Sequence, residues 1–205
     1  MKHARLCLVL ALVSLAPALS QTGGHRDQPV GTDGQPPFQL STTTFRNGGE
    51  LPLVMVLGSD FCSYVSGGGD QSPELSWTNA PYGTKTFVVT LFDVTAAFTH
   101  WGMYNIARGT TELPENAGVS GSKYGQQVFN DFYLGPEYDG PCPPNNLTPL
   151  VHEYVFTVFA LDTNLYLPSS PPNFPANAET LYRAMSDHIL GQASIHGFFS
   201  STDQE

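Results

Sequence analysis

The chain has 205 residues, of which 40% are hydrophobic and 13% are charged, and it contains 20 glycines and 17 prolines. This length fits a single domain with one hydrophobic core, and the glycine and proline content argues against a helical bundle or a coiled coil. The formal net charge of −10 would repel a phosphate backbone, which argues strongly against nucleic-acid binding. An anion could still bind, but only at a small site that creates its own positive potential.

Residues 1–20 have the pattern of a secretory signal peptide. Lys2 and Arg5 precede an apolar run over residues 6–15, and Ala18-Leu19-Ser20 places small side chains where a signal peptidase reads them. The apolar run is too short to span a bilayer, and no later run is longer. An N-terminal anchor that stays uncut is the alternative. The pattern therefore predicts a secreted protein, extracellular or periplasmic, with no transmembrane segment.

Residues 21–37 follow the predicted cleavage site and contain very few apolar side chains. Such a segment cannot bury enough surface to fold alone, so we expect a flexible leader. The composition shows no second regime and no internal repeat beyond it. We therefore predict one domain over residues 38–200 and a short tail over residues 201–205.

Two cysteines remain after removal of the signal peptide, because Cys7 leaves with it. Cys62 and Cys142 form an even pair in an oxidising compartment, which favours a disulfide. Such a bridge would stabilise the fold by about 4 kcal/mol in the chain-entropy model. Two buried free thiols are the alternative. Neither cysteine lies in a CxxC pair, so the sequence gives no support to a zinc or redox motif.

The strongest secondary-structure signals are extended. Residues 86–92 (TFVVTLF) and 154–161 (YVFTVFAL) are rich in β-branched and aromatic side chains and apolar on both faces, which predicts central strands of a covered sheet. Weaker strand signals cover residues 38–45, 75–77, 100–106 and 192–199. These segments predict a mainly β architecture. The stretch between Ile106 and Tyr154 is dense in glycine, proline and asparagine, and long loops of this kind are usually functional.

One helix is predicted near the C-terminus, over residues 178–190. Five side chains with helical spacing form an apolar stripe: Ala178, Leu181, Tyr182, Met185 and Ile189. Asn177 can cap the start of this helix, and Gly191 can end it.

Three side chains could gather at one end of the sheet. Asp93 follows a predicted central strand and His100 opens the next extended segment, so a tight connection would bring the carboxylate beside the imidazole. His152 precedes the other central strand and follows the rigid Gly140-Pro141-Cys142-Pro143-Pro144 segment. Histidines donate hydrogen bonds and become positive near neutral pH, so this cluster predicts a small anion pocket. His188 and His196 are interpreted as structural.

A set of short motifs in a fixed order resembles one protein family. These motifs are SPELSW (72–77), TKTFVVTLFD (84–93), His100-Trp101, YNI (104–106), LPENAG (113–118), NDF (130–132), YDGPCPP (138–144), His152 with YVFTV (154–158), ALDT (160–163), and Ala184-Met185 with His188. Together they are similar to the phosphatidylethanolamine-binding protein family, in its bacterial-type, Raf kinase inhibitor-like branch. Each motif is weak alone, but their joint order over residues 38–199 is specific.

The resemblance implies a fold and a site. It implies a central antiparallel sheet, a smaller flanking sheet, a few helices including one near the C-terminus, and a pocket for phosphate groups such as phospholipid headgroups. Asp93 matches the first aspartate of the family's DPDAP motif, His100 and His152 match its pocket histidines, and Tyr154 matches the aromatic residue that follows. The proline-rich wall of the pocket matches Gly140, Pro143 and Pro144.

Two departures from the family pattern lie beside the predicted pocket. The DPDAP motif is replaced by Asp93-Val94-Thr95-Ala96-Ala97, which lacks both prolines and the second carboxylate, so we expect a less preorganised wall and weaker or altered binding. The inserted segment 145–151 contains the sequon Asn146-Leu147-Thr148, a candidate glycosylation site in a secreted protein.

Three function classes follow from these patterns. The favoured one is a secreted, non-catalytic binding protein for phosphate-bearing ligands, with Asp93 accepting from an imidazole, both histidines donating to the ligand, and no cofactor. The second is an inhibitor or modulator of a peptidase or another protein partner, acting through the pocket rim. The third, a hydrolase, lacks support because Ser72 has no nucleophile-elbow context. A metal site formed by Asp93, His100 and His152 has permissible ligands but no tight ligand spacing.

Overall fold

The computed structural model describes residues 36–58, 62–167 and 176–202. The predicted signal peptide lies outside these residues, as does the predicted leader up to residue 35. No helix in the described part of the chain is long and apolar enough to cross a membrane.

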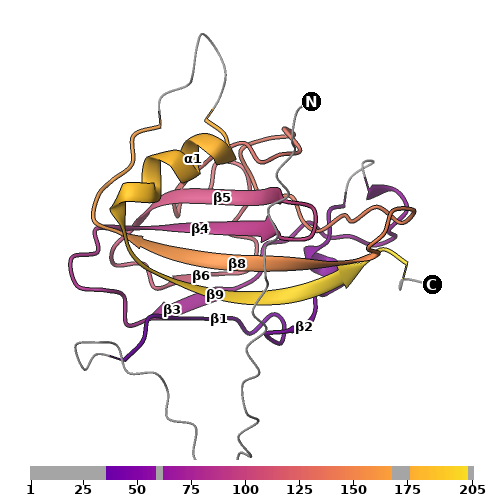
Figure 1. Ribbon diagram of the computed structural model, residues 1–205, viewed down its shortest axis with the longest axis horizontal. Coiled ribbons are helices and arrows are strands. Elements are labelled where there is room, and N and C mark those ends of the chain that lie inside the picture. Colours follow the sequence, from indigo (N-terminus) through magenta and orange to yellow (C-terminus); the bar gives the residue numbers. More distant parts are fainter. Residues whose placement is uncertain (1–35, 59–61, 168–175, 203–205) are drawn as a thin grey trace, which may run out of the picture.

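A six-stranded sheet forms the centre of the described domain (Figure 1), in the order β2-β9-β8-β4-β5-β7. All neighbouring strands are antiparallel except the short parallel pair of β2 and β9. The strands are β2 (Gly49–Glu50), β4 (Thr86–Asp93), β5 (Phe98–Ala107), β7 (Gln126–Gln127), β8 (Val151–Leu161) and β9 (Ile189–Ser200). The two segments predicted as central strands are β4 and β8, which lie side by side in the middle of the sheet.

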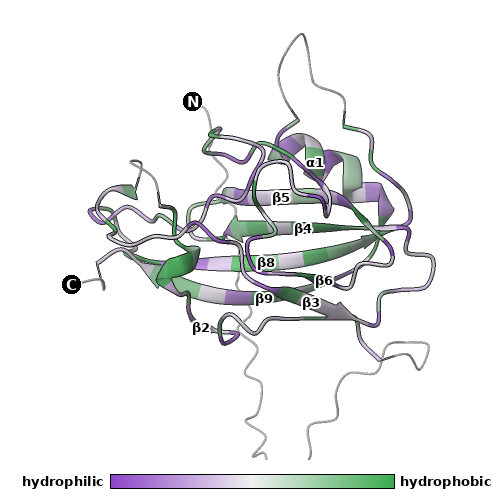
Figure 2. Ribbon diagram, turned by 180° about the vertical axis from the view of Figure 1, so that it is seen from behind, coloured by the Kyte–Doolittle hydropathy of each residue, from purple (hydrophilic) through white to green (hydrophobic). Residues whose placement is uncertain are grey.

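A smaller sheet covers one face of the large one. It consists of β1 (Gln39–Ser41), β3 (Leu75–Thr78) and β6 (Glu112–Leu113), all antiparallel. Aromatic side chains fill the space between the sheets: Trp77 packs edge-on against Phe87 with ring centroids 5.2 Å apart. Figure 2 shows hydrophobic residues concentrated on strands such as β3 and β4, and hydrophilic ones mostly in the loops. The predicted fold, a central antiparallel sheet with a smaller flanking sheet, is confirmed.

A helix packs against the opposite face of the large sheet. It is α1 (Ala178–Met185), which continues directly into the 3-10 turn η3 (Ser186–His188), and another 3-10 turn, η1 (Leu53–Met55), precedes β3. The predicted cap is confirmed: the Asn177 side chain accepts a hydrogen bond from the Thr180 amide at 3.0 Å. A second hydrophobic cluster lies beneath the helix and contains Val88, Tyr104, Val128, Phe159, Leu161, Leu165, Leu181 and Met185.

The predicted end of this helix is wrong. The structure ends α1 at Met185, adds the η3 turn, and begins β9 at Ile189, which pairs with Leu161 of β8. Gly191 lies inside the strand instead of ending a helix. A Cβ there would lie 2.8 Å from Cγ of Pro81, so the glycine permits close packing. The helical spacing of Ile189 did not exclude a strand, because a short apolar segment suits either structure. Pairing with β8 makes residues 189–191 the start of β9.

The weaker strand predictions are correct in kind, although their lengths differ. The segment 38–45 contributes only the short β1, whereas the segments 100–106 and 192–199 extend to become β5 and β9. Both extended strands are lengthened by pairing with a long central neighbour.

Candidate functional site

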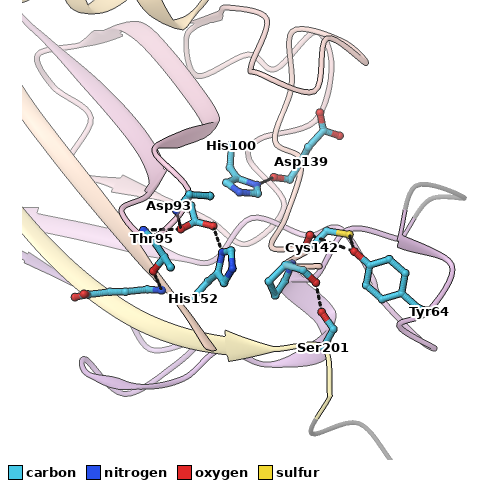
Figure 3. A network of polar contacts seen from close by, with 11 residues as sticks. Tyr64, Asp93, Thr95, His100, Asp139, Cys142, His152 and Ser201 are labelled. Atoms are coloured by element: carbon cyan, nitrogen blue, oxygen red, sulfur yellow. Dashed lines mark hydrogen bonds and ion pairs between the residues drawn. The ribbon is translucent and has the colours of Figure 1, made fainter. Parts of the chain in front are cut away.

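The predicted site residues meet at one end of the large sheet, where β4 ends and both β5 and β8 begin (Figures 1 and 3). Asp93 is the last residue of β4 and pairs with Tyr154 of β8 and with Phe98 of β5. His100 lies on β5 and His152 on β8. Sheet pairing therefore brings together side chains that are far apart in the sequence.

Asp93 is a buried carboxylate that receives three hydrogen bonds from the protein. Its Oδ1 accepts from the amides of Thr95 and Ala96 at 2.8 and 2.9 Å, and its Oδ2 lies 2.6 Å from Nδ1 of His152. An aspartate that accepts from the amides after it closes a turn without any proline. The Asp93 carboxylate therefore stabilises this turn, although the prolines of the DPDAP pattern are missing.

His152 is the imidazole that pairs with Asp93. We expected the carboxylate to lie beside His100, which is nearer in sequence, but its hydrogen bond goes across the sheet to β8. The turn over residues 94–97 directs β5 back along β4, while Asp93 stands directly opposite Tyr154 of β8. Since a carboxylate accepts, Nδ1 of His152 donates, and Nε2 is an acceptor in the neutral ring and a donor in the imidazolium form.

His100 has a different partner and an apolar setting. Its Nδ1 lies 2.9 Å from the backbone oxygen of Asp139 (Figure 3). The imidazole is only 3% exposed, and the rings of Phe98, Phe132 and Tyr154 surround it with centroids 5.0, 5.3 and 5.3 Å away. Burial lowers the pKa of His100 to about 4, against the opposing effect of nearby carbonyls and carboxylates. The imidazole is therefore neutral at physiological pH.

Tyr154 completes the set of rings at the site. Its ring stacks beside that of His152 with centroids 6.3 Å apart, and its side chain is fully buried. The hydroxyl is enclosed near the Asp93 carboxylate and makes no hydrogen bond of normal geometry among the described residues. Burial, reinforced by the nearby Asp93 carboxylate, raises the pKa of Tyr154, so the phenol keeps its proton.

The proline-rich segment forms the opposite side of the site. Gly140 packs so closely on η1 that a Cβ would lie 1.9 Å from the Met55 oxygen, so only glycine fits there. The amide of Leu57 donates to the Pro141 oxygen at 3.1 Å. The hydroxyl of Ser201, the first residue of the predicted tail, donates a hydrogen bond to the backbone oxygen of the buried Pro143. Pro144 is half-buried and leads out to the exposed residues that follow.

The predicted disulfide is confirmed. Cys62 and Cys142 are bonded, with Cα atoms 5.8 Å apart. The bond ties the proline-rich segment to the loop that ends at Asp70, and Tyr64 adds a contact from its hydroxyl to Sγ of Cys142 at 3.1 Å (Figure 3). Cys62 is buried and Cys142 half-buried, so the bridge lies between this loop and the site.

Asp70 is a member of this region that the sequence reasoning missed. Its Oδ1 accepts from the Gly140 amide at 2.8 Å. Burial raises the pKa of Asp70 to about 6, and the carboxylates of Asp139 and Glu137 add to that rise while the Gly140 amide opposes it. Burial also raises the pKa of Asp139 to about 6. The available signal was the run Gly67-Gly68-Gly69 before Asp70, because a lone acid after glycines often has a left-handed backbone, and φ here is 51°.

The remaining predicted residues lie away from this cluster. Asn146 is exposed in the segment that precedes β8. His196 pairs with Glu153 at 2.5 Å and His188 pairs with Asp162 at 2.8 Å, both half-exposed. No group of three histidine, cysteine or acidic side chains in the described ranges is placed to hold a metal ion.

The family model for phosphatidylethanolamine-binding protein matches residues 41–200. This chain belongs to the phosphatidylethanolamine-binding protein family. A UPF0098 protein of Aquifex aeolicus (strain VF5) is 37% identical over 170 residues, covering 79% of this chain and 88% of the relative. The UPF0098 protein YbhB of Escherichia coli (strain K12) is 36% identical over 170 residues, covering 80% of this chain and all of the relative.

Solved structures of the family share the fold. The crystal structure of E. coli YbcL, described as a new member of the mammalian PEBP family, aligns with a TM-score of 0.66 and 28% identity, covering 80% of this chain and 98% of the other. A putative PEBP homologue from Chlamydia trachomatis, CT736, aligns with a TM-score of 0.61 and 26% identity, covering 80% and 97% of the two chains. The resemblance inferred from ordered motifs is therefore confirmed, and the chain is a binding protein of this family.

Proposed function

We propose that this chain is a non-catalytic binding protein whose Asp93, His100, His152 and Tyr154 cluster takes a small phosphate-bearing anion. The observation that carries the proposal is the buried pair of His152 and Asp93, with Nδ1 and Oδ2 2.6 Å apart, beside the rings of Tyr154 and His100. In the imidazolium form Nε2 of His152 donates, and a phosphate oxygen would be its acceptor. On a chain with a net charge of −10, such donors supply the local attraction that the overall charge does not.

The arrangement supports binding better than catalysis. Asp93 is already occupied by three N–H donors, so it orients His152 and is not free to take a proton from a substrate. Within the described residues neither histidine is hydrogen-bonded to a serine, threonine or cysteine that could act as a nucleophile. Phosphate binding with release of the unchanged ligand is the simpler use of these groups.

Export is a further part of the proposal. The signal-peptide pattern of residues 1–20 and a disulfide between Cys62 and Cys142 both fit an oxidising compartment. N-terminal sequencing of the mature protein from culture medium and periplasm would test it. A chain that begins at Gln21 supports export, and a cytoplasmic chain that keeps its first residues contradicts it.

Calorimetry with methyl phosphate tests the binding proposal. His152→Ala should weaken binding by roughly tenfold or more, because a hydrogen bond to a charged group is lost. His196→Ala is the matched control, since His196 also pairs with a carboxylate but is half-exposed on β9. Its affinity should equal that of the wild type. Equal binding by the wild type and His152→Ala, or no binding by the wild type, would overturn the proposal.

A further inference from the structure

A second cleft lies at the end of the large sheet where β4 begins and β5 ends (Figure 1), away from the Asp93 cluster. Its volume is about 260 Å³, and it lies between the connection that precedes β4 and the connection that follows β5. Phe87 in its lining and Asp93 are both on β4, so about 20 Å of strand separates the two places. The other lining residues include Pro81, Tyr82, Thr84, Arg108 and Thr111.

Hydrogen bonds hold both connections in place. Before β4, the Thr84 hydroxyl donates to the Pro81 oxygen at 2.6 Å. After β5, the Thr111 oxygen accepts from the Trp77 amide of β3 at 2.9 Å, which ties this connection to the smaller sheet. The two walls of the cleft are therefore fixed, so a ligand would have little backbone to order when it binds.

Aromatic rings supply the apolar part of the cleft. Phe87 is only 1% exposed and packs edge-on against Trp77, so its position is set by the core. Tyr82 is 94% exposed, so its ring is available to pack against another molecule. Rings of this kind pack well against a flat apolar group.

Arg108 supplies positive charge, and the described residues do not neutralise it. Within those residues the ion pairs use other cations, namely His152, Arg183, His188 and His196. A guanidinium presents its N–H donors in a planar fork that matches the two oxygens of a carboxylate. On a chain with a net charge of −10, such a group is a local attraction for an anion.

Lys85 adds to the positive charge at this end of the sheet. It comes directly before β4, and Arg108 comes directly after β5, the strand that pairs with β4. The acids of the adjoining segments are Glu112 on β6 and Asp162 after β8, and Asp162 forms an ion pair with His188 at 2.8 Å. Neither acid forms an ion pair with Lys85 or Arg108.

From this arrangement we propose that the cleft binds a small carboxylic acid that carries a flat apolar group. The carboxylate would accept from the Arg108 guanidinium, and the apolar group would lie against Phe87 and Tyr82. Pockets for drug-sized ligands have volumes of about 300 to 1,000 Å³. The smaller cleft here favours an acid with one ring over a nucleotide or a large cofactor. This site is separate from the one in the proposed function.

Calorimetry with phenylacetate and 2-phenylacetamide tests this inference, because the two probes have similar shapes and only the first is charged. The wild type should bind phenylacetate roughly fivefold more tightly than the amide. Arg108→Gln should remove that preference. Arg46→Gln is the matched control, since Arg46 is also exposed but lies between β1 and β2 and does not line the cleft. Its preference should equal that of the wild type.

His152→Ala distinguishes the two sites. Its affinity for phenylacetate should equal that of the wild type, because His152 lies at the other end of the sheet. Loss of phenylacetate binding in this variant would place the acid in the Asp93 cluster and overturn the inference, while leaving anion binding there intact. Failure of methyl phosphate to bind overturns the proposed function and does not touch this cleft.

Three other results would also overturn the inference. They are no binding of phenylacetate by the wild type, equal binding of phenylacetate and its amide, and unchanged binding by Arg108→Gln. Because Arg108 is exposed, its replacement should leave the fold intact, which urea unfolding checks. Nitrogen-15 NMR gives a reading without any variant: phenylacetate should shift the Nε–H signal of Arg108, and an unmoved signal contradicts the inference.

A free aromatic acid and the C-terminal residue of a peptide share this chemistry. N-acetylphenylalanine separates the two sources, because it adds the peptide bond that precedes a C-terminal residue. Tighter binding than that of phenylacetate assigns the ligand to a peptide end, and weaker binding assigns it to a free acid. Both results support a carboxylate site at Arg108, provided that Arg108→Gln weakens them.

Discussion

The two sides of the candidate site are built differently. On the sheet side, Asp93, His152 and Tyr154 are placed by the register of β4 and β8. On the loop side, the segment around Gly140 is held by a disulfide, by close packing on η1 and by hydrogen bonds from other loops. Strand pairing fixes the first side at many points, whereas the second depends on a few connections.

The acidic groups show the same contrast. The Asp93 carboxylate receives two amides and one imidazole, so its charge is well compensated. Asp70 receives the Gly140 amide and Asp139 receives the Asn130 amide group, but burial raises both pKa values to about 6, and repulsion from Glu137 adds to the rise at both. The carboxylate charge on the sheet side is therefore compensated, and the loop side carries electrostatic strain that its covalent connection holds in place.

The largest expected effect is on the loop side. Replacing both cysteines, Cys62→Ser with Cys142→Ser, should lower the free energy of unfolding by about 4 kcal/mol, because the bridge closes a loop between residues 80 positions apart. Denaturant unfolding of the oxidised wild type and the double variant measures this difference. Dithiothreitol should destabilise the wild type by a similar amount and leave the double variant unchanged.

Hydrogen exchange on the double variant sharpens the contrast between the two sides. The amides of Leu57 and Gly140, which bond across the loop side, should exchange faster relative to global unfolding. The amide of Val89, in the middle of β4, should keep its relative protection. Uniform loss of protection would contradict the view that the bridge acts locally on the loop side.

A smaller effect is expected on the sheet side. Asp93→Ala should lower the free energy of unfolding by about 3 kcal/mol, because it leaves the His152 nitrogen buried without its partner and removes the acceptor that closes the following turn. Glu153→Ala is the matched control, because Glu153 lies next to His152 on β8 and also pairs with a histidine.

Both carboxylates pair with a histidine, but they differ in burial, and Asp93 also accepts the two amides of the following turn. Side-chain exposure is 3% for Asp93 and 35% for Glu153, and the Glu153–His196 pair is open to solvent. Its loss should lower the free energy of unfolding by less than about 1 kcal/mol. Equal effects of the two substitutions in urea unfolding would show that burial does not set the strength of these pairs.

The same division governs what the sequence could predict. The sheet side was predictable because β4 and β8 have continuous apolar patterns and the ordered family motifs place Asp93, His152 and Tyr154 at their ends. The hydrogen bond between Asp93 and His152 could not be predicted, because it depends on the register of β4 and β8. The sequence shows only that His100 is nearer to Asp93 along the chain. Asp70 escaped prediction because its partner, the Gly140 amide, comes from a segment 70 positions away.

Asp70→Asn gives the smallest effect, and its sign depends on pH. A carboxyl group whose pKa is raised from 3.8 to about 6 in the folded state prefers to be protonated there. Its unfavourable contribution to the free energy of unfolding is absent below pH 3.8, grows as the unfolded chain ionises, and is complete above about pH 6.

Asparagine at position 70 keeps an oxygen for the Gly140 amide and carries no charge at any pH. The variant should therefore be more stable than the wild type by about 1 kcal/mol at pH 7.5, after the weaker hydrogen bond is allowed for, and by much less at pH 4. Urea unfolding at the two pH values measures both differences, and a variant less stable than the wild type at pH 7.5 would show that the charge of Asp70 holds the loop side together.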